Sequence, residues 1–185
     1  MKRLEINYKW AHSPFGNLLA EKESRNNYNI CNRISNGIVK EVRKLEIIRL
    51  TIEEIQTKQK NREVFAVGRF QLIPITLQAA IDKLGLDTKC RLDEGMQDRI
   101  FQEFLIDKKR PAIIRFLEKD GNIGEAMYAS ALEWASVGVE KGKKLANGTI
   151  ANGGESYYHG DGLNKAHISP EEIKKALEDS KNNKK

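Results

Sequence analysis

Residues 66–86, AVGRFQLIPITLQAAIDKLGL, place a short aromatic segment directly before an amphipathic helix. After Pro74, apolar residues recur with helical spacing until Gly85, which is a common C-terminal stop. The overlapping residues 63–72, EVFAVGRFQL, are β-branched and aromatic, and they predict a strand. The stretch therefore predicts a small β region that leads directly into a helix. The apolar positions of that helix are Leu77, Ala80, Ile81 and Leu84.

Helix signals dominate the rest of the chain, so the fold class expected is α+β and mainly helical. Residues 35–50 are ambiguous, because their apolar spacing suits a helix while EIIRL at 46–50 suits a strand. Residues 111–121 predict a short helix and 123–139 a long one. Residues 142–165 are rich in glycine and asparagine and predict a loop, which either closes a cleft flexibly or packs through its tyrosines. Helix starts are predicted at Ser13 before Pro14, Thr51 with Glu54, Asp93, and Ser169 with Glu172.

Length and composition predict one globular domain over residues 1–185, because 39% of the 185 residues are hydrophobic and no linker or repeat divides them. Residues 1–12 are expected to form an N-terminal extension and 180–185 a flexible tail. No apolar run is long enough to span a bilayer. The N-terminus lacks the apolar stretch of a signal peptide, so synthesis in the cytoplasm is expected.

The net charge of +6 favours polyanionic partners, although part of it lies in the lysine-rich C-terminus. The two cysteines, Cys31 and Cys90, have no zinc spacing and are expected to be buried free thiols, with a disulfide as the alternative. The three histidines are scattered, so no metal is expected. HGDG at 159–162 is interpreted as a turn.

Glu23 is the strongest catalytic candidate. It follows Leu19 by four residues and Phe15 by eight, so it lies on the apolar face of the predicted first helix. Partial burial raises a carboxyl pKa and suits a general acid near neutral pH. The alternative is an ordinary last-turn glutamate. Glu21 lies on another face and is expected to be solvated.

A glycosidase with two carboxylates needs a second acid across the scissile bond. Glu63, just before the predicted strand, is the best placed, and without it a mechanism with one acid follows. Within GRFQ, Gly68 permits close approach of a ligand, Phe70 offers an apolar face to a sugar ring, and Gln71 can donate and accept hydrogen bonds. Further aromatic residues could stack on sugars or pack in the core: Tyr28, Trp134, Tyr157 and Tyr158.

Taken together, GRFQL at 68–72 before a helix, QDRI at 97–100 and EWASV at 133–137 resemble the lysozymes of lambda-like bacteriophages and their prophage-encoded relatives. EKESRNNYNICNR at 21–33 resembles the Glu-Ser motif that ends the first helix of lysozyme-like and lytic transglycosylase domains. GGESYYHGDGLNKAHISPEEI at 153–173 is similar to a C-terminal segment of muramidase domains in phage endolysins and type VI secretion effectors. The order and spacing of these pieces span Ser13 to Leu177.

The resemblance implies a lysozyme-like α+β fold with a cleft between a helical body and a small β region. It implies cleavage of the β-1,4 bond between N-acetylmuramic acid and N-acetylglucosamine, with Glu23 as the acid and no cofactor. Gly68, Phe70 and Gln71 then fall on the strand that lines the substrate. Phe70 departs from the pattern, because tyrosine is common at its position.

The resemblance leaves the reaction and the setting open. The product forms either by hydrolysis or by closure of a 1,6-anhydro ring, as in lytic transglycosylases. A non-catalytic module that binds cell wall or nucleic acid is the alternative of another class. The chain could be a holin-released endolysin or a secreted antibacterial effector, alone or as a domain of a larger protein, and it would act on peptidoglycan in the periplasm or cell wall. An effector would have a cognate immunity protein as partner; no nucleic acid partner is expected.

Overall fold

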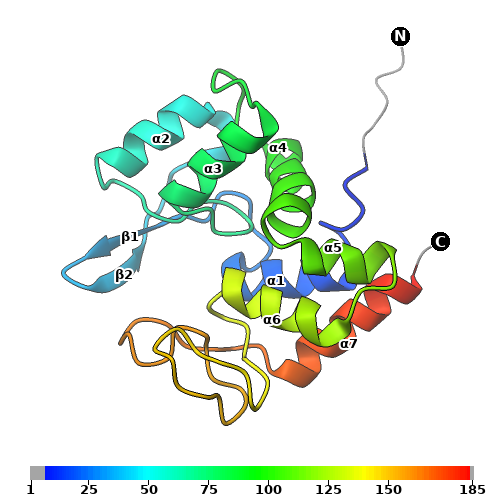
Figure 1. Cartoon of the computed structure of the whole chain (residues 1–185). Coiled ribbons are helices and arrows are strands. Elements are labelled where there is room, and N and C mark those ends of the chain that lie inside the picture. Colours follow the sequence, from blue (N-terminus) through cyan, green and yellow to red (C-terminus); the bar gives the residue numbers. More distant parts are fainter. Residues whose placement is uncertain (1–6, 184–185) are drawn as a thin grey trace.

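The computed structural model describes residues 7–183 and contains two groups of helices that meet beside a small hairpin (Figure 1). One group comprises α1 (Pro14–Ser24), α5 (Pro111–Glu118), α6 (Ile123–Glu133) and α7 (Pro170–Asn182). The other comprises α2 (Ile52–Lys60), α3 (Pro74–Leu84) and α4 (Glu94–Arg99), and α4 continues into the π-helix η2 (Ile100–Lys109). The mainly helical α+β class is confirmed.

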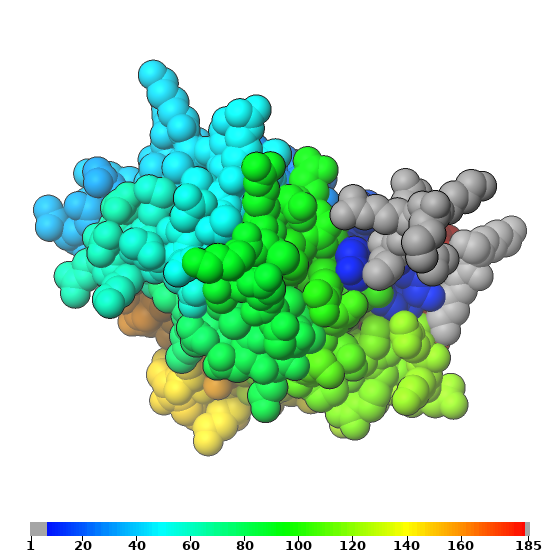
Figure 2. All heavy atoms as spheres, turned by 90° about the horizontal axis from the view of Figure 1, so that it is seen from above, coloured from blue at the N-terminus to red at the C-terminus, as the bar shows by residue number. Residues whose placement is uncertain are grey.

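The sheet is an antiparallel hairpin of β1 (Asn32–Ser35) and β2 (Ile38–Glu41). The turn residues Asn36 and Gly37 both have positive φ angles, 52° and 73°, which suits a tight two-residue hairpin. The ambiguous residues 35–50 thus form a turn, β2 and the short helix η1 (Ile47–Arg49). Seen from above, the hairpin lies at one edge of the molecule, beside the surface formed by α2 and α3 (Figure 2).

The prediction of a strand at residues 63–72 is wrong. The segment forms a tight turn in which the Gln71 N–H donates to the Gly68 carbonyl at 3.2 Å, and only isolated β-bridges form at Val67. Gly68 and Gln71 both have positive φ angles, 77° and 52°, which a regular strand does not accommodate. Of the β-branched and aromatic residues in this segment, Val64, Val67 and Phe70 are buried in the core, and Phe65 is partly buried. Their apolar character serves this packing and not the pairing of a regular strand.

The helix starts predicted from capping residues are confirmed. Ser13 accepts from the Gly16 N–H, Asp93 accepts from the Met96 N–H, and both Thr51 and Ser169 form full capping boxes. Gly85 ends α3 in the left-handed conformation. The helix predicted over 123–139 is shorter than expected, because α6 ends at Glu133 and the chain then turns.

Both predicted terminal segments are more ordered than expected wherever the structure describes them. Trp10 and Ala11 are buried in the core, so the packed chain begins before residue 13; residues 1–6 of the predicted extension lie outside the described residues. Residues 180–182 belong to α7, and the buried Ser180 hydroxyl accepts from the Phe15 N–H at 2.8 Å. Residues 184–185 of the predicted tail also lie outside the described range.

The loop at 142–165 packs through its tyrosines. The ring of Tyr157 lies edge-on to Tyr128 and Tyr158, with centroids 6.1 and 5.1 Å apart. Leu145 and Ala151 from the same loop are buried. The HGDG segment is a turn, as predicted, and the Asp161 carboxylate accepts hydrogen bonds from the Leu163 and Asn164 N–H groups.

Four aromatic rings lie where the two groups of helices meet. Phe70 stacks on Phe101 at 4.1 Å between centroids, and Phe101 in turn contacts Phe15 and Trp134 at 6.2 and 5.8 Å. The rings come from α1, the 66–72 turn, η2 and the end of α6, and all are nearly inaccessible to solvent. This aromatic cluster therefore fixes the relative positions of the segments that carry the candidate site.

No helix among residues 7–183 has both the length and the apolar composition that a bilayer span requires.

Candidate active site

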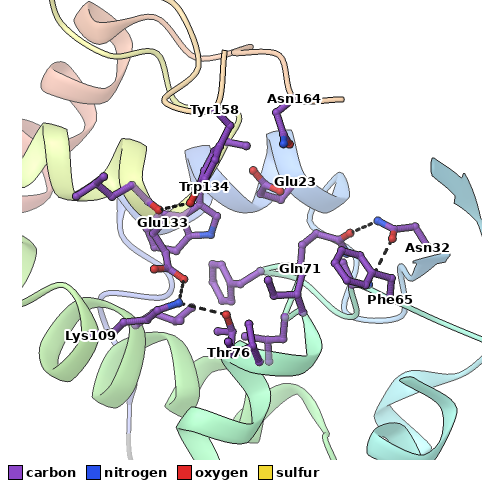
Figure 3. Close-up of a pocket in the computed structure, with 18 of the residues that line it drawn as sticks. Glu23, Asn32, Phe65, Gln71, Thr76, Lys109, Glu133, Trp134, Tyr158 and Asn164 are labelled. Carbon is purple, nitrogen blue, oxygen red and sulfur yellow. Dashed lines mark hydrogen bonds and ion pairs between the residues drawn. The ribbon is translucent and has the colours of Figure 1, made fainter. Parts of the chain in front are cut away.

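A cavity of about 560 Å³ opens where these segments meet (Figure 3). Its walls come from the last turn of α1, the hairpin, the 65–76 segment, the end of η2, the end of α6 and the 142–165 loop. Phe70 and Trp134 from the aromatic cluster form part of its lining. The polar residues lining it are Glu23, Asn32, Gln71, Thr76, Lys109, Arg110, Glu133, Tyr158 and Asn164.

Glu23 lies half-buried at this cavity, in the last turn of α1, with Phe15 and Leu19 fully buried on the same helix. Its carboxylate accepts a short hydrogen bond from the Ser136 hydroxyl. Burial raises the pKa of Glu23 above its ordinary value of 4.5, and the Ser136 hydrogen bond partly opposes the increase. The described residues give this carboxyl no salt bridge, so it retains its proton to higher pH than a solvated glutamate.

A second hollow of about 300 Å³ also has Glu23 in its lining. Asn32, Val39 and Gln71 line both hollows together with Glu23. Glu23 therefore lines two hollows that share part of their walls.

Gln71 is oriented by its own neighbours. Its Oε1 accepts from the Asn32 amide at 2.8 Å, and its Nε2 donates to the Gly68 carbonyl at 2.9 Å. Asn32 is fixed in turn by the Ala66 N–H, which donates to its Oδ1 at 3.3 Å. The turn at 66–72 thus presents an ordered pair of amides to the cavity beside Glu23.

Of the other residues proposed from the sequence, Phe70, Gln71, Trp134 and Tyr158 line the main cavity, and Phe70 exposes only 3% of its surface. Phe70 is chiefly a core residue stacked on Phe101. Tyr157 packs behind Tyr158 within the loop and does not line either hollow.

Glu63 is not positioned as the second acid. It lines neither hollow, its side chain is 51% exposed, and its carboxylate accepts from Lys58 at 2.9 Å. The hydrogen bonds from Lys58 and Asn61 lower its pKa. The prediction of Glu63 rested on a strand at 63–72 that does not form.

Gly68 and Tyr28 belong to a buried network outside the cavity. A Cβ at position 68 would overlap the side chain of Gln97, so glycine is needed for packing there and not for a ligand. The Tyr28 hydroxyl donates to Asp98 at 2.9 Å. Arg69 donates to Asp98 at 3.3 Å and to the Asn26 side chain at 3.2 Å, which secures the chain just after α1.

Sequence reasoning missed Ser136 and the charged group formed by Lys109, Arg110 and Glu133. Ser136 lies 113 residues from the glutamate it contacts, and Glu133 lies more than 20 residues from both of its cations. Pairings at such separations leave no local periodicity. The EWASV motif contained both Glu133 and Ser136, but its spacing alone assigned neither a partner.

Among residues 7–183, no three His, Cys, Asp or Glu side chains are grouped so that they could hold a metal ion. Both cysteines are free; Cys31 is buried as expected, whereas Cys90 is exposed. Comparisons of the chain with protein-family models, with curated proteins and with solved structures found no match.

Proposed function

We propose that the protein is a peptidoglycan glycosidase that cleaves the β-1,4 bond between N-acetylmuramic acid and N-acetylglucosamine. The observation that supports this most directly is the environment of Glu23. Glu23 is a half-buried carboxyl with a raised pKa, it has no cationic partner among residues 7–183, and it lines two hollows that share part of their walls. These properties suit a general acid that protonates a glycosidic oxygen.

The lining of the cavity supports a sugar polymer as substrate. Pyranose rings present apolar faces and hydrogen-bonding edges, and the cavity offers Trp134 and Tyr158 for the former and Asn32 and Gln71 for the latter. The sequence resemblance to phage lysozymes and muramidase domains is what selects peptidoglycan among such polymers.

In the proposed reaction, the Glu23 carboxyl gives its proton to the oxygen of the leaving N-acetylglucosamine as the bond to C1 of the muramoyl unit breaks. An oxocarbenium-like centre develops at C1. A water molecule or the C6 hydroxyl of the muramoyl unit then attacks C1, and the Glu23 carboxylate takes the proton released by the attacking group.

Among residues 7–183, no unpaired second carboxylate lines the two hollows, which favours the C6 hydroxyl as the attacking group. Among the described residues that line the two hollows, the only other acids are Glu133 and Glu41. Glu133 pairs with Lys109 and Arg110, and Glu41 pairs with Arg25 at 2.8 Å. An intramolecular attack needs no second base, so a lytic transglycosylase is the second candidate function.

Mass spectrometry of peptidoglycan fragments tests both candidates. Purified cell walls are digested with wild type, Glu23→Gln and the control Glu21→Gln, which changes an exposed glutamate on the same helix. We expect Glu23→Gln to lower the rate by 10²–10⁴-fold, on the order attributed to a general acid, and Glu21→Gln to leave it unchanged.

The masses of the products separate the two reactions. Reducing muropeptides indicate hydrolysis, and products lighter by one water indicate 1,6-anhydro sugars. Soluble fragments released by Glu23→Gln at the wild-type rate would exclude the proposed role of Glu23. A wild type that binds walls and releases nothing would instead indicate a binding module.

A further inference from the structure

The charged group missed in the sequence lies at one end of the cavity, away from Asn32 and Phe65 at the other (Figure 3). Lys109 Nζ donates to Glu133 at 2.8 Å and to the Thr76 hydroxyl at 3.2 Å. Arg110 donates to the other Glu133 oxygen at 2.9 Å and to the Leu132 carbonyl at 3.0 Å. Two cations thus share one carboxylate.

This end of the cavity has an excess of positive charge. Glu133 is 6% exposed and compensates only one of its two partners, whose side chains are 30% and 25% exposed. Glu23, the other acid lining the cavity, has a raised pKa and adds little negative charge while it is protonated. Lys109 has one further N–H, and the Arg110 guanidinium has N–H groups that none of these hydrogen bonds uses.

We propose that Lys109 and Arg110 bind a carboxylate of the substrate, carried by the lactyl group of a muramoyl unit without a peptide or by the peptide attached to such a unit. This inference rests on the proposed function, because only the muramoyl unit of the glycan carries such a group. A carboxylate held by an ammonium and a guanidinium gains charge-assisted hydrogen bonds, and it neutralises the excess charge in a partly desolvated site.

Binding of a carboxylate at this end of the cavity makes the site selective for glycans that contain muramoyl units. A polymer of N-acetylglucosamine alone has the same β-1,4 backbone and no carboxylate, so it gains nothing at this end of the cavity. Glu133 then acts as a positioning residue, because it holds both cations at the cavity wall through separate oxygens.

Calorimetry with peptide-free tetrasaccharides of alternating N-acetylglucosamine and N-acetylmuramic acid tests the lactyl carboxylate. The protein carries Glu23→Gln to prevent cleavage, and the ligands are the free acid, its methyl ester and chitotetraose. A second pair of ligands tests the peptide carboxylates. These are the same tetrasaccharide with its peptides attached, once as the free acid and once as the methyl ester. We expect one pair to show about tenfold weaker binding of the ester, the size of one charge-assisted hydrogen bond.

Lys109→Gln is expected to remove this difference, and Arg110→Gln provides an independent second variant. Lys108→Gln is the matched control, because it removes the same charge from the adjacent, exposed position, which does not line the cavity. The preference for the free acid should persist in Lys108→Gln. Circular dichroism establishes that each variant is folded.

Equal binding of acid and ester in both pairs would overturn the inference, as would an equal loss of preference in Lys108→Gln and Lys109→Gln. If the wild type still cleaves peptidoglycan in either case, the proposed function stands and only the carboxylate site is rejected. If no saccharide binds and the wild type releases no wall fragments, both proposals fail.

Discussion

Two carboxyl groups that are shielded from solvent, Asp98 and Glu23, differ sharply in their surroundings. Asp98 is 7% exposed, and it accepts hydrogen bonds from Arg69 and Tyr28 and contacts the ring nitrogen of His12 at 2.7 Å. Glu23 is also shielded from solvent, but Ser136 is its one hydrogen-bond partner among the described residues. Asp98 is paired with a cationic side chain, whereas burial without such a partner raises the pKa of Glu23.

The difference teaches how one small protein uses burial in two ways. A buried carboxylate with an arginine partner holds segments of the chain together, and its removal leaves an unpaired charge. A buried carboxyl without such a partner costs stability when it ionises, and that cost is what makes it a proton donor. The number of partners, and not burial alone, separates the structural acid from the candidate catalytic one.

The largest effect on stability is expected from removing Arg69, the cation that pairs with the buried Asp98. Arg69→Ala leaves Asp98 buried without its cation, and we expect the free energy of unfolding to fall by about 3–5 kcal/mol. Urea denaturation measures this change. Arg99→Ala is the control, because it removes an arginine from a more exposed ion pair with Glu103 and should cost less than about 1 kcal/mol. Equal losses in the two variants would contradict the structural role of Asp98.

For Glu23, the comparison predicts that a substitution raises the free energy of unfolding above that of wild type instead of lowering it. The folded-state pKa of Glu23 is raised above its ordinary value of 4.5, so its protonated form stabilises the fold at low pH and that stability is lost as pH rises through the folded pKa. Glu23→Gln cannot ionise. It should therefore match wild type below pH 4.5 and become increasingly more stable than wild type above it, by about 1.4 kcal/mol for each unit by which the pKa is raised.

Thermal unfolding of both proteins between pH 4 and 8 measures this divergence. Parallel stability curves, or a Glu23→Gln variant that is less stable at pH 8, would show that Glu23 is held as a carboxylate like Asp98.

The smallest effect is expected at Glu63, which belongs to neither class of buried acid. Glu63→Gln removes one exposed ion pair with Lys58, and wall-cleaving activity should stay within about twofold of wild type. Glu53→Gln is the matched control, since Glu53 forms a comparable exposed pair with Lys89. A loss of activity at position 63 that position 53 does not share would restore Glu63 as a candidate second acid.

The parts of the structure that the sequence predicted well are those determined by neighbouring residues. Capping residues act within three positions, so Thr51 and Ser169 marked their helices reliably. Glu23 was found because helical spacing alone places it on the face of Phe15 and Leu19.

The parts that failed depend on contacts between distant segments. Aromatic and β-branched residues at 63–72 suggested a strand, but they pack into the core around a turn. The actual hairpin had a local signal in Asn36-Gly37, which competed with a helical apolar spacing across 35–50. The pairing of Glu133 with Lys109 and Arg110 forms only when α6 and η2 come together in the fold, and no local sequence pattern predicts it.

The hydrogen bond from the Phe15 N–H to Ser180 has a consequence for the timing of folding. It joins residues 165 positions apart, and α1 packs directly against α7. On the ribosome, α1 emerges first of the described helices and α7 last, so a nascent chain that ends before residue 170 lacks part of the surface on which α1 rests. The helix that carries Glu23 is thus among the first elements to be synthesised and among the last to be fixed in place.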